Sequence, residues 1–268
     1  MSNALTRQEA KQASANAVEV VPVAGTIGAE IRGVKVSGDL DAGTVAQIRT
    51  TLLKYKVVFF RDQHHLDDLR QEAFSALFGE LLKHPMVKAA GQSKALLELQ
   101  RTEAYAASVW HTDMTFMPDP PAFSVLRSLA VPPVGGDTMW ANAANGYQRL
   151  PAPLKALAES LWAIHSSDFD FDGAFCDEYK AWMKDYTANI KKYPIQTEHP
   201  VVHVHPETGE RSLLLGSWLK RFVGLKNSDS AKIYEVLESY VSDAENTVRW
   251  AWRMRSEERR VGKECRSR

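Results

Sequence analysis

Cysteine is scarce in this chain of 268 residues, which contains only Cys176 and Cys265. Two thiols are too few for a disulfide framework or for a metal cage built from cysteine thiolates. A surplus of either charge is also lacking, because 33 Lys and Arg residues face 33 Asp and Glu residues. This balance argues against a broad nucleic-acid or acidic-membrane surface, which needs an excess of basic side chains.

Long apolar runs are absent as well. No run reaches the roughly 18 residues that a membrane-spanning helix needs, and the first 17 residues are polar, without the apolar core of a secretory signal. These absences predict a cytoplasmic protein that binds neither membrane nor nucleic acid. The length and the 44% hydrophobic content suffice for one sizeable core.

The pattern of apolar residues predicts one domain over residues 18–252, after a disordered segment at 1–17. Apolar side chains at helical spacing indicate helices at 41–56, 67–79, 151–164 and 228–241. β-branched or alternating runs indicate strands within 18–36 and at 57–60, 123–131, 201–205, 212–217 and 246–252. Residues 167–195 read as an excursion or lid. Many short strands with helices between them predict an α+β fold, mainly β with helical cover.

His111 and Asp113 form an H-x-D pattern in the segment VWHTDMTF. On an extended segment their side chains project to one side, about 7 Å apart along the chain, so both could bind one ion. An imidazole and a carboxylate, completed by a distant second histidine, make the facial triad of Fe(II) oxygenases. The pattern is weak by itself, because a surface histidine near a helix-capping aspartate has the same spacing.

The sequence around this pattern resembles the taurine-dioxygenase-like family of Fe(II)- and 2-oxoglutarate-dependent oxygenases. In that family W-H-T-D precedes G-G-D-T-x-W, and this chain has WHTD at 110–113 and GGDTMW at 135–140. The likeness extends over residues 18–252 through GAEIRGVKVSGDLD, KVVFFRDQHHLDD, FGELLKHP, EHPVVHVHPETGERSLLLG and NTVRWAW. These segments are most similar to the alkylsulfatase, or sulfate ester dioxygenase, type. The resemblance implies a double-stranded β-helix, or jelly-roll, core.

The resemblance also implies roles for five residues. His111 and Asp113 would be iron ligands, and the Thr138 hydroxyl would bond a carboxylate of 2-oxoglutarate. His84 would contact the sulfate or sulfonate of the substrate, an anion that suits a histidine donor, and Met114 would line the substrate pocket. No catalytic side chain is implied beyond the metal ligands. Plainer interpretations are turn or N-cap chemistry for Thr138, a structural histidine before a proline for His84, and core packing for Met114.

His203 and His205 offer an alternative metal site. Their H-x-H spacing places two imidazoles on one face of a strand, an arrangement that could bind zinc. The resemblance assigns this strand to the core sheet without a metal ligand, and no water-activating Glu motif accompanies the pair. We therefore favour the H-x-D pattern.

The family pattern also contains a second iron-binding histidine and a later arginine that pairs with 2-oxoglutarate. Continuing the pattern past Trp252 places the histidine near Ser267, and neither residue is matched. Residues 253–268 carry seven basic and three acidic side chains and resemble translated vector sequence more than a natural basic tail. We expect the natural C-terminus, with the last strands of the core, to be missing, and the printed chain to bind iron weakly with little turnover.

For the full-length protein, the resemblance implies a reaction that uses Fe(II), 2-oxoglutarate and O2. The enzyme would hydroxylate the carbon next to the sulfate-ester oxygen of an alkyl sulfate and release aldehyde, sulfate, succinate and CO2. Alternatives are a taurine, alkanesulfonate or aryloxyalkanoate dioxygenase, and a non-catalytic scaffold without the second metal histidine. The family commonly forms homo-oligomers, and we expect one here.

Overall fold

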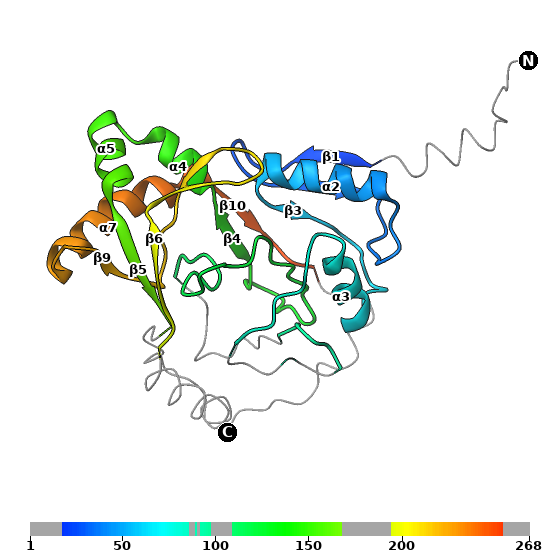
Figure 1. Ribbon diagram of the computed structural model, residues 1–268. Helices are drawn as coiled ribbons and strands as arrows, with labels where there is room; N and C mark the ends of the chain where they lie inside the picture. The colour runs from blue at the N-terminus through cyan, green and yellow to red at the C-terminus, as the bar shows by residue number, and fades with distance from the viewer. Residues whose placement is uncertain (1–17, 86–88, 90–91, 98–108, 168–193, 254–268) are drawn as a thin grey trace, which may run out of the picture. The chain divides into compact units, whose positions relative to one another are not determined.

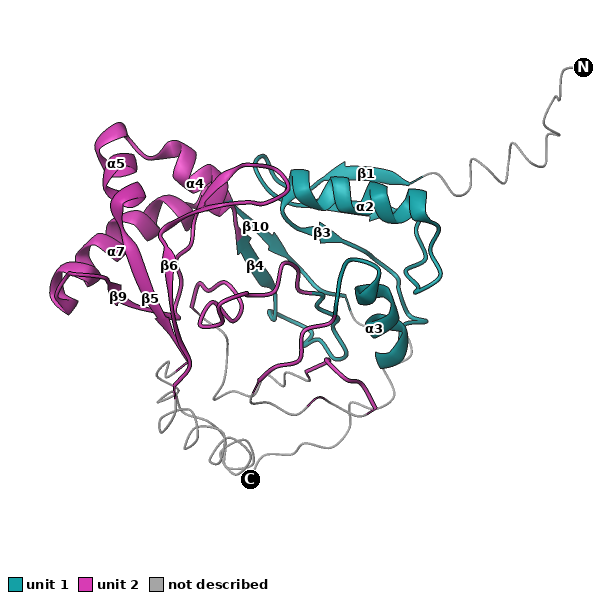
Figure 2. Ribbon diagram, viewed as in Figure 1, with its two compact units in different colours: residues 1–80, 125–140, 247–268 teal, residues 81–124, 141–246 magenta. Residues whose placement is uncertain are grey.

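The computed structural model describes residues 18–85, 89, 92–97, 109–167 and 194–253. The chain divides into two compact units, shown in Figure 2, and each is described by itself. Unit 1 contains residues 1–80, 125–140 and 247–268, and unit 2 contains residues 81–124 and 141–246. The segment expected to be disordered at 1–17, nearly all of the excursion at 167–195 and residues 254–268 lie outside the described residues. No helix within the described ranges is long and apolar enough to cross a membrane.

In its described part, unit 1 combines two small sheets with two helices (Figure 1). Its strands are β1 (Glu19–Pro22), β2 (Ala29–Arg32), β3 (Val58–Phe59), β4 (Thr138–Ala141) and β10 (Thr247–Trp250). β2 pairs antiparallel with β1 and parallel with β3, and β4 pairs with β10. The helices are α2 (Ala42–Tyr55) and α3 (Asp68–Ala76). The Asp41 and Asp67 side chains cap them by accepting hydrogen bonds from backbone N–H groups.

Two apolar clusters stabilise unit 1. One forms between β2, α2 and α3 from Ile31, Val34, Val36, Ile48, Leu66 and Phe74. The other joins Ile27 and Phe59 to the inward side chains of β10, where Val248 and Trp250 are buried. Phe59 stacks on Trp250 with ring centroids 4.0 Å apart. The alternation expected for the strand at 246–252 is thus confirmed, since every second side chain enters the core.

The described residues of unit 2 form a three-stranded sheet, a hairpin and three α-helices. The sheet has the order β6 (Gln196–Pro200), β5 (Trp162–Ser166), β9 (Leu219–Phe222), and both pairings are antiparallel. The hairpin joins β7 (Val202–Val204) to β8 (Arg211–Leu213). The helices are α4 (Ala143–Arg149), α5 (Ala152–Ser160) and α7 (Asn227–Val241), followed by the 3-10 turn η1 (Ala244–Asn246). Their buried apolar residues share one core with β5, β8 and β9.

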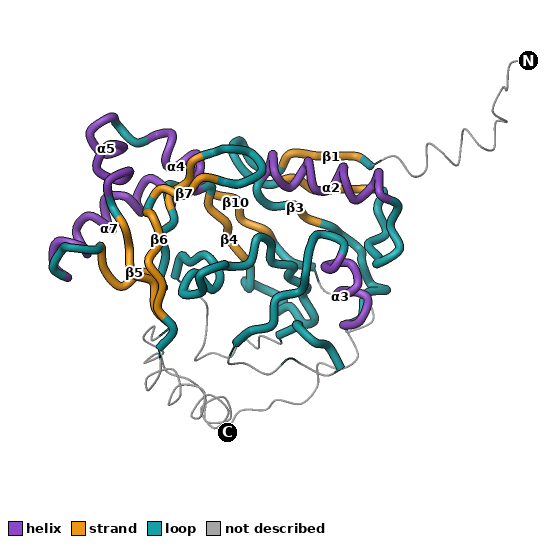
Figure 3. The backbone as a smooth tube through the Cα atoms, viewed as in Figure 1, coloured by secondary structure: helices purple, strands orange, loops and turns teal. Residues whose placement is uncertain are grey.

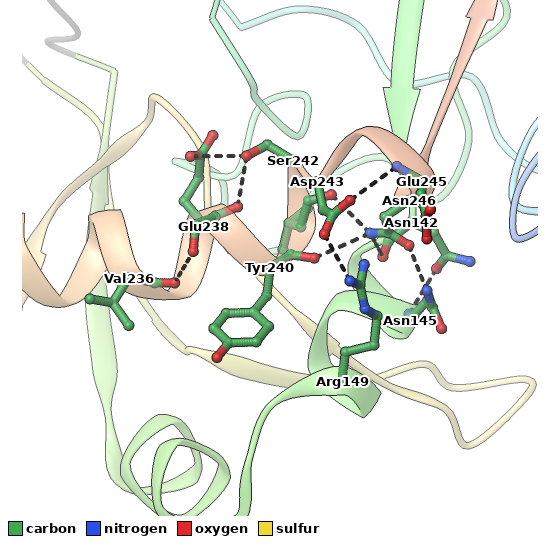
Figure 4. Close-up of polar contacts among 12 residues, drawn as sticks. Asn142, Asn145, Arg149, Val236, Glu238, Tyr240, Ser242, Asp243, Glu245 and Asn246 are labelled. Atoms are coloured by element: carbon green, nitrogen blue, oxygen red, sulfur yellow. Dashed lines mark hydrogen bonds and ion pairs between the residues drawn. The ribbon is translucent and has the colours of Figure 1, made fainter.

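A buried asparagine, Asn246, links the end of α7 to the start of α4 through hydrogen bonds (Figure 4). The Asn246 side chain has no exposed surface, and its amide donates to Asn142 O and Val241 O, each at 2.8 Å. Its Oδ1 accepts from Asn145 Nδ2, also at 2.8 Å. These bonds satisfy the buried amide, which would otherwise destabilise the fold.

The strand expected at 123–131 is wrong, because the structure forms no strand there. The chain between α3 and β4 is irregular wherever it is described (Figure 3). Val125, Leu126 and Leu129 are 41%, 51% and 40% exposed, and Val125 O accepts a hydrogen bond from the Gln71 side chain. An apolar, β-branched run becomes a strand only where a neighbouring strand offers backbone partners.

The helix expected at 151–164 begins where expected but ends early. Pro151 occupies the N-cap position of α5, and the helix stops at Ser160. The backbone of Leu161 is extended, and the next five residues form the central strand β5. Residues 162–166 therefore form a strand because partner strands lie on both sides, although the spacing of their apolar side chains favours a helix.

The described chain is a mixed α/β fold with several small sheets, and its strands form no closed barrel. Helices account for more of the described residues than strands do, so the expected predominance of β structure is not found. One reason is that several expected strands are short. β3 has two residues where four were expected, and β8 has three where six were expected.

Candidate functional site

His111 and Asp113 lie together in unit 2, with Nε2 of the imidazole 3.4 Å from Oδ1 of the carboxylate. Their side chains are partly exposed, at 37% and 49%. The pKa of His111 is raised, mainly by its hydrogen bond with Asp113, and the pKa of Asp113 is lowered, mainly by the same bond. The pair is therefore stabilised when His111 is protonated and Asp113 is ionised. A divalent cation held by the same two side chains would take the place of that proton.

The hydrogen bonds around this pair suit metal binding. The His111 Nδ1–H donates to Val109 O at 3.0 Å, which leaves Nε2 as the ligand atom in the neutral ring. A metal-binding histidine commonly donates its other ring N–H in this way. The Ser124 hydroxyl donates to Asp113 Oδ2 at 2.5 Å, which leaves Oδ1 facing His111. His111 Nε2 and Asp113 Oδ1 would therefore be the two atoms that hold a divalent ion such as Fe(II), because both donors are free of these supporting bonds and face each other.

The pair does not lie on the extended segment that the sequence analysis assumed. Asp113 begins a turn in which Met117 N donates to Met114 O at 2.9 Å. Met114 has a left-handed backbone, with φ of 53°, a conformation that is uncommon for residues other than glycine. The chain therefore turns directly after Asp113. Met114, expected to line the substrate pocket, is half-buried beside the pair.

His84 also lies in unit 2. Its ring meets Phe116 edge-to-face, with centroids 6.3 Å apart, and Phe116 belongs to the turn after Asp113. Burial lowers the pKa of His84, so at neutral pH the side chain is an uncharged imidazole with one N–H donor. The structure therefore places the residue expected to contact the substrate anion against the turn that carries Asp113.

Thr138 lies in unit 1 as the first residue of β4. Gly135 and Gly136 precede it with φ of 77° and 75°, a left-handed backbone that glycine adopts without steric cost. The Trp252 indole N–H donates to Thr138 Oγ1 at 2.8 Å. A hydroxyl that already accepts this bond still has its own proton to donate, and a carboxylate is a suitable acceptor.

Two residues of the site were not predicted from the sequence. Ser124 bonds to Asp113 but stands eleven positions away, in the run that was read as a strand. Gly216 has φ of 118°, and a Cβ atom there would lie 2.8 Å from His111 Cα. A glycine inside an apolar strand pattern is a signal of close backbone approach, and that signal in SLLLGS could have identified Gly216.

The alternative site at His203 and His205 gains no support. His203 is exposed, and His205 Nδ1 accepts hydrogen bonds from backbone N–H groups of the turn at 207–208. Over the described parts of the chain, no group of three or more His, Cys, Asp or Glu side chains is arranged to hold a metal. The His111–Asp113 pair is the candidate site because its donors converge and its hydrogen bonds suit coordination.

Comparison with known families decides the assignment. Residues 19–254 match the model of the taurine catabolism dioxygenase TauD, TfdA family. The chain belongs to this family. The TauD, TfdA family match covers both units, including the WHTD and GGDTMW segments.

Two similar relatives are named for sulfate esters. The chain is 48% identical over 235 residues to the α-ketoglutarate-dependent sulfate ester dioxygenase of Pseudomonas putida, covering 88% of this chain and 78% of the relative. It is 46% identical over 228 residues to the alkylsulfatase of Acinetobacter baylyi, covering 85% and 72%. The (S)-phenoxypropionate/α-ketoglutarate dioxygenase of Sphingobium herbicidovorans is 28% identical over 243 residues, covering 88% of this chain and 83% of the relative.

Solved structures agree with the assignment to the TauD, TfdA family. A taurine dioxygenase from Burkholderia xenovorans superposes with a TM-score of 0.69 at 37% identity, covering 88% of this chain and 77% of that one. The structure of AAD-2 in complex with Mn(II) and N-oxalylglycine has a TM-score of 0.68 at 21% identity, covering 89% and 84%. The second likeness concerns the fold alone.

Proposed function

We propose that this protein is an Fe(II)- and 2-oxoglutarate-dependent dioxygenase that acts on alkyl sulfate esters. It hydroxylates the carbon that bears the ester oxygen, and the product collapses to aldehyde and sulfate while 2-oxoglutarate becomes succinate and CO2. The relatives named for sulfate esters support this substrate class. The observation that carries the proposal is the convergence of His111 Nε2 and Asp113 Oδ1, 3.4 Å apart.

His111 and Asp113 would hold the iron. Bound Fe(II), together with 2-oxoglutarate and O2, supplies the oxidising power that the reaction needs. The imidazole contributes a neutral donor, and the carboxylate offsets one positive charge. The bonds from His111 to Val109 O and from Ser124 to Asp113 fix both side chains before a metal arrives.

Thr138 and His84 would hold the two anions. The Thr138 hydroxyl, oriented by Trp252, would donate to a carboxylate of 2-oxoglutarate. His84 would donate its N–H to the sulfate of the substrate, and Met114 would line the same pocket. Burial lowers the pKa of His84 in the protein without substrate, and the negative charge of a bound sulfate would act in the opposite direction, because it favours the protonated ring.

The test uses the product of the complete reading frame with Fe(II), O2, 2-oxoglutarate and a medium-chain alkyl sulfate. Succinate and sulfate should appear in equal amounts, and omission of 2-oxoglutarate should stop both. Sulfate release that continues without 2-oxoglutarate would indicate a hydrolase. If the protein turned over taurine or an aryloxyalkanoate but not the sulfate ester, it would still be a 2-oxoglutarate-dependent dioxygenase, and the proposed substrate class would be wrong.

Matched variants connect the activity to the site. Asp113→Ala should abolish turnover and iron binding while the protein stays folded by circular dichroism, because an open metal site seldom holds a core together. His203→Ala changes an exposed histidine of β7 and should leave iron content and turnover intact. Normal activity in a folded Asp113→Ala protein would contradict the assignment of Asp113 as an iron ligand. Loss of iron from His203→Ala would instead place the iron site at the hairpin of β7 and β8.

We also propose a cytoplasmic homo-oligomer with a jelly-roll core that binds neither nucleic acid nor membrane. The equal numbers of acidic and basic residues support the absence of a polyanion-binding surface. Trp162 is half exposed in β5, and the neighbouring Val223, whose N–H bonds to Trp162 O, is 40% exposed. Neighbouring apolar side chains with this much exposed surface favour contact with a second protein chain. Light scattering that finds a monomer would contradict the oligomer.

A further inference from the structure

The turn that follows Asp113 is buried, although Asp113 itself is partly exposed. Thr115 and Phe116 have no exposed surface. A turn this far inside the protein has polar backbone and side-chain groups that need partners. Those partners come from the paired strands β5 and β6, about 50 and 80 residues further along the chain.

His165 of β5 makes the first of these contacts. Its ring is fully buried, and Nδ1 lies 2.8 Å from the Thr115 hydroxyl oxygen. Burial lowers the pKa of His165 to about 4, so the ring is neutral near pH 7. Its Nε2 is buried and has no hydrogen-bond partner among the residues that the structure describes. An apolar residue of similar volume would avoid this unsatisfied atom, so stability alone does not account for a histidine here.

Two residues of β6 make the remaining contacts. His199 Nε2–H points at two carbonyls of the turn, Thr115 O at 2.9 Å and Met117 O at 3.1 Å. The Thr197 hydroxyl donates to Phe116 O, between them, at 2.8 Å. Three successive carbonyls of the turn are therefore bound to one strand.

These three side chains share one face of the sheet. His165 is paired directly with Thr197 across β5 and β6, and His199 stands two residues further along β6. Paired residues and residues two apart point to the same side. The two imidazoles meet edge-to-face with centroids 5.3 Å apart, which fixes each ring against the other.

We propose that His165, Thr197 and His199 are positioning residues that hold the turn so that the Asp113 carboxylate meets the His111 imidazole. Only Met114 separates Asp113 from Thr115, so a shift of Thr115 moves the carboxylate. A paired sheet is a rigid support, and metal ligands need such support to stay in register. This role rests on the proposed function, because it concerns the same iron site.

The test compares Thr115→Val with Thr115→Ser. Valine keeps the shape of threonine and removes the hydroxyl that meets His165, whereas serine restores it. Thr197→Val is a milder second variant, because it removes one bond at a partly buried position. Thr51→Val is the matched control, since Thr51 is a buried threonine of α2 whose hydroxyl bonds within its own helix.

The first measurement is anaerobic Fe(II) titration of the product of the complete reading frame. Thr115→Val should bind Fe(II) about 10-fold more weakly, as loss of an outer contact to a metal site commonly does. Thr197→Val should weaken binding in the same direction, and Thr115→Ser and Thr51→Val should stay close to wild type. The second measurement, hydrogen exchange of the Met117 amide in the metal-free protein, should be faster in Thr115→Val and Thr197→Val only.

The outcomes separate this inference from the proposed function. A folded Thr115→Val protein with wild-type iron affinity and exchange would overturn the positioning role and leave the dioxygenase assignment intact. Equal losses in Thr115→Val and Thr51→Val would also overturn it, because the effect would then be one of stability. A wild-type protein without iron affinity would overturn the proposed function itself.

Discussion

The indole Nε1 of Trp252 donates a 2.8 Å hydrogen bond to the hydroxyl oxygen of Thr138. Trp252 stands two residues after the end of β10, and Thr138 is the first residue of β4, the strand with which β10 pairs. Because the hydroxyl accepts from the indole, its own proton is directed elsewhere. This relationship makes Trp252 the residue that orients the proposed donor to 2-oxoglutarate.

Substitution of Trp252 by phenylalanine should therefore raise the KM for 2-oxoglutarate. Loss of one hydrogen bond costs about 1 kcal/mol, which corresponds to about a 5-fold increase. Steady-state kinetics with varied 2-oxoglutarate provides the measurement. Thr138→Val should show a larger increase and Thr138→Ser a small one; an unchanged KM in both Trp252→Phe and Thr138→Val would remove Thr138 from the cosubstrate site.

Substitution of Gly216 by alanine should disturb His111. The added Cβ would lie 2.8 Å from His111 Cα and 3.2 Å from Thr112 N, so one of the two backbones must shift. We expect weaker Fe(II) binding together with a loss of stability of about 1–3 kcal/mol from strain. Gly209→Ala is the control, because Gly209 has φ of 69° with no neighbour within 4 Å of the added atom. Equal iron affinities in the two variants would show that Gly216 does not support His111.

Substitution of Asn246 by alanine should lower the free energy of unfolding by about 3 kcal/mol. The change removes the hydrogen bonds of a side chain that has no exposed surface and leaves the carbonyls of Asn142 and Val241 without the amide that serves them (Figure 4). Urea unfolding measures the loss. Asn145→Ala removes only one of these bonds and should cost about 1 kcal/mol, so a similar loss in both variants would contradict the network.

The stability of the protein should depend on His165 below neutral pH. The pKa of His165 is about 4 in the folded protein, below the value of about 6.5 for an unfolded chain. Between these values the unfolded chain binds more protons, so stability falls as the pH falls through that window. Burial is the main cause of the lowered pKa, and the nearby imidazole of His199 adds to it.

This contribution amounts to about 2 kcal/mol between pH 7 and pH 5. Urea unfolding of the wild type should therefore lose about 2 kcal/mol more over this interval than unfolding of His165→Gln, which cannot titrate. At pH 8 and above His165 is almost wholly neutral in both states, and the two proteins should then respond alike to pH. Parallel pH dependence down to pH 5 would mean that His165 is protonated as easily in the folded protein as in the unfolded chain.

The sequence alone determined the elements that follow from local periodicity and capping. The helices α2 and α7 and the strand β10 lie where the spacing of apolar residues places them. The segments WHTD and GGDTMW also carried enough information to indicate the family, since iron and 2-oxoglutarate chemistry requires particular residues in a particular order. The pairing of His111 with Asp113 was predictable for the same reason.

Only the tertiary structure decided how those residues are supported. Residues 123–131 and 162–166 have similar apolar character, but the second segment became a strand because β6 and β9 supply its backbone partners. Asp113 begins a turn because β5 and β6 bind the residues that follow it. Ser124, His165 and Trp252 act on residues 11 to 114 positions away. Local sequence patterns do not encode contacts at such separations, because folding brings these residues together only when the sheets form.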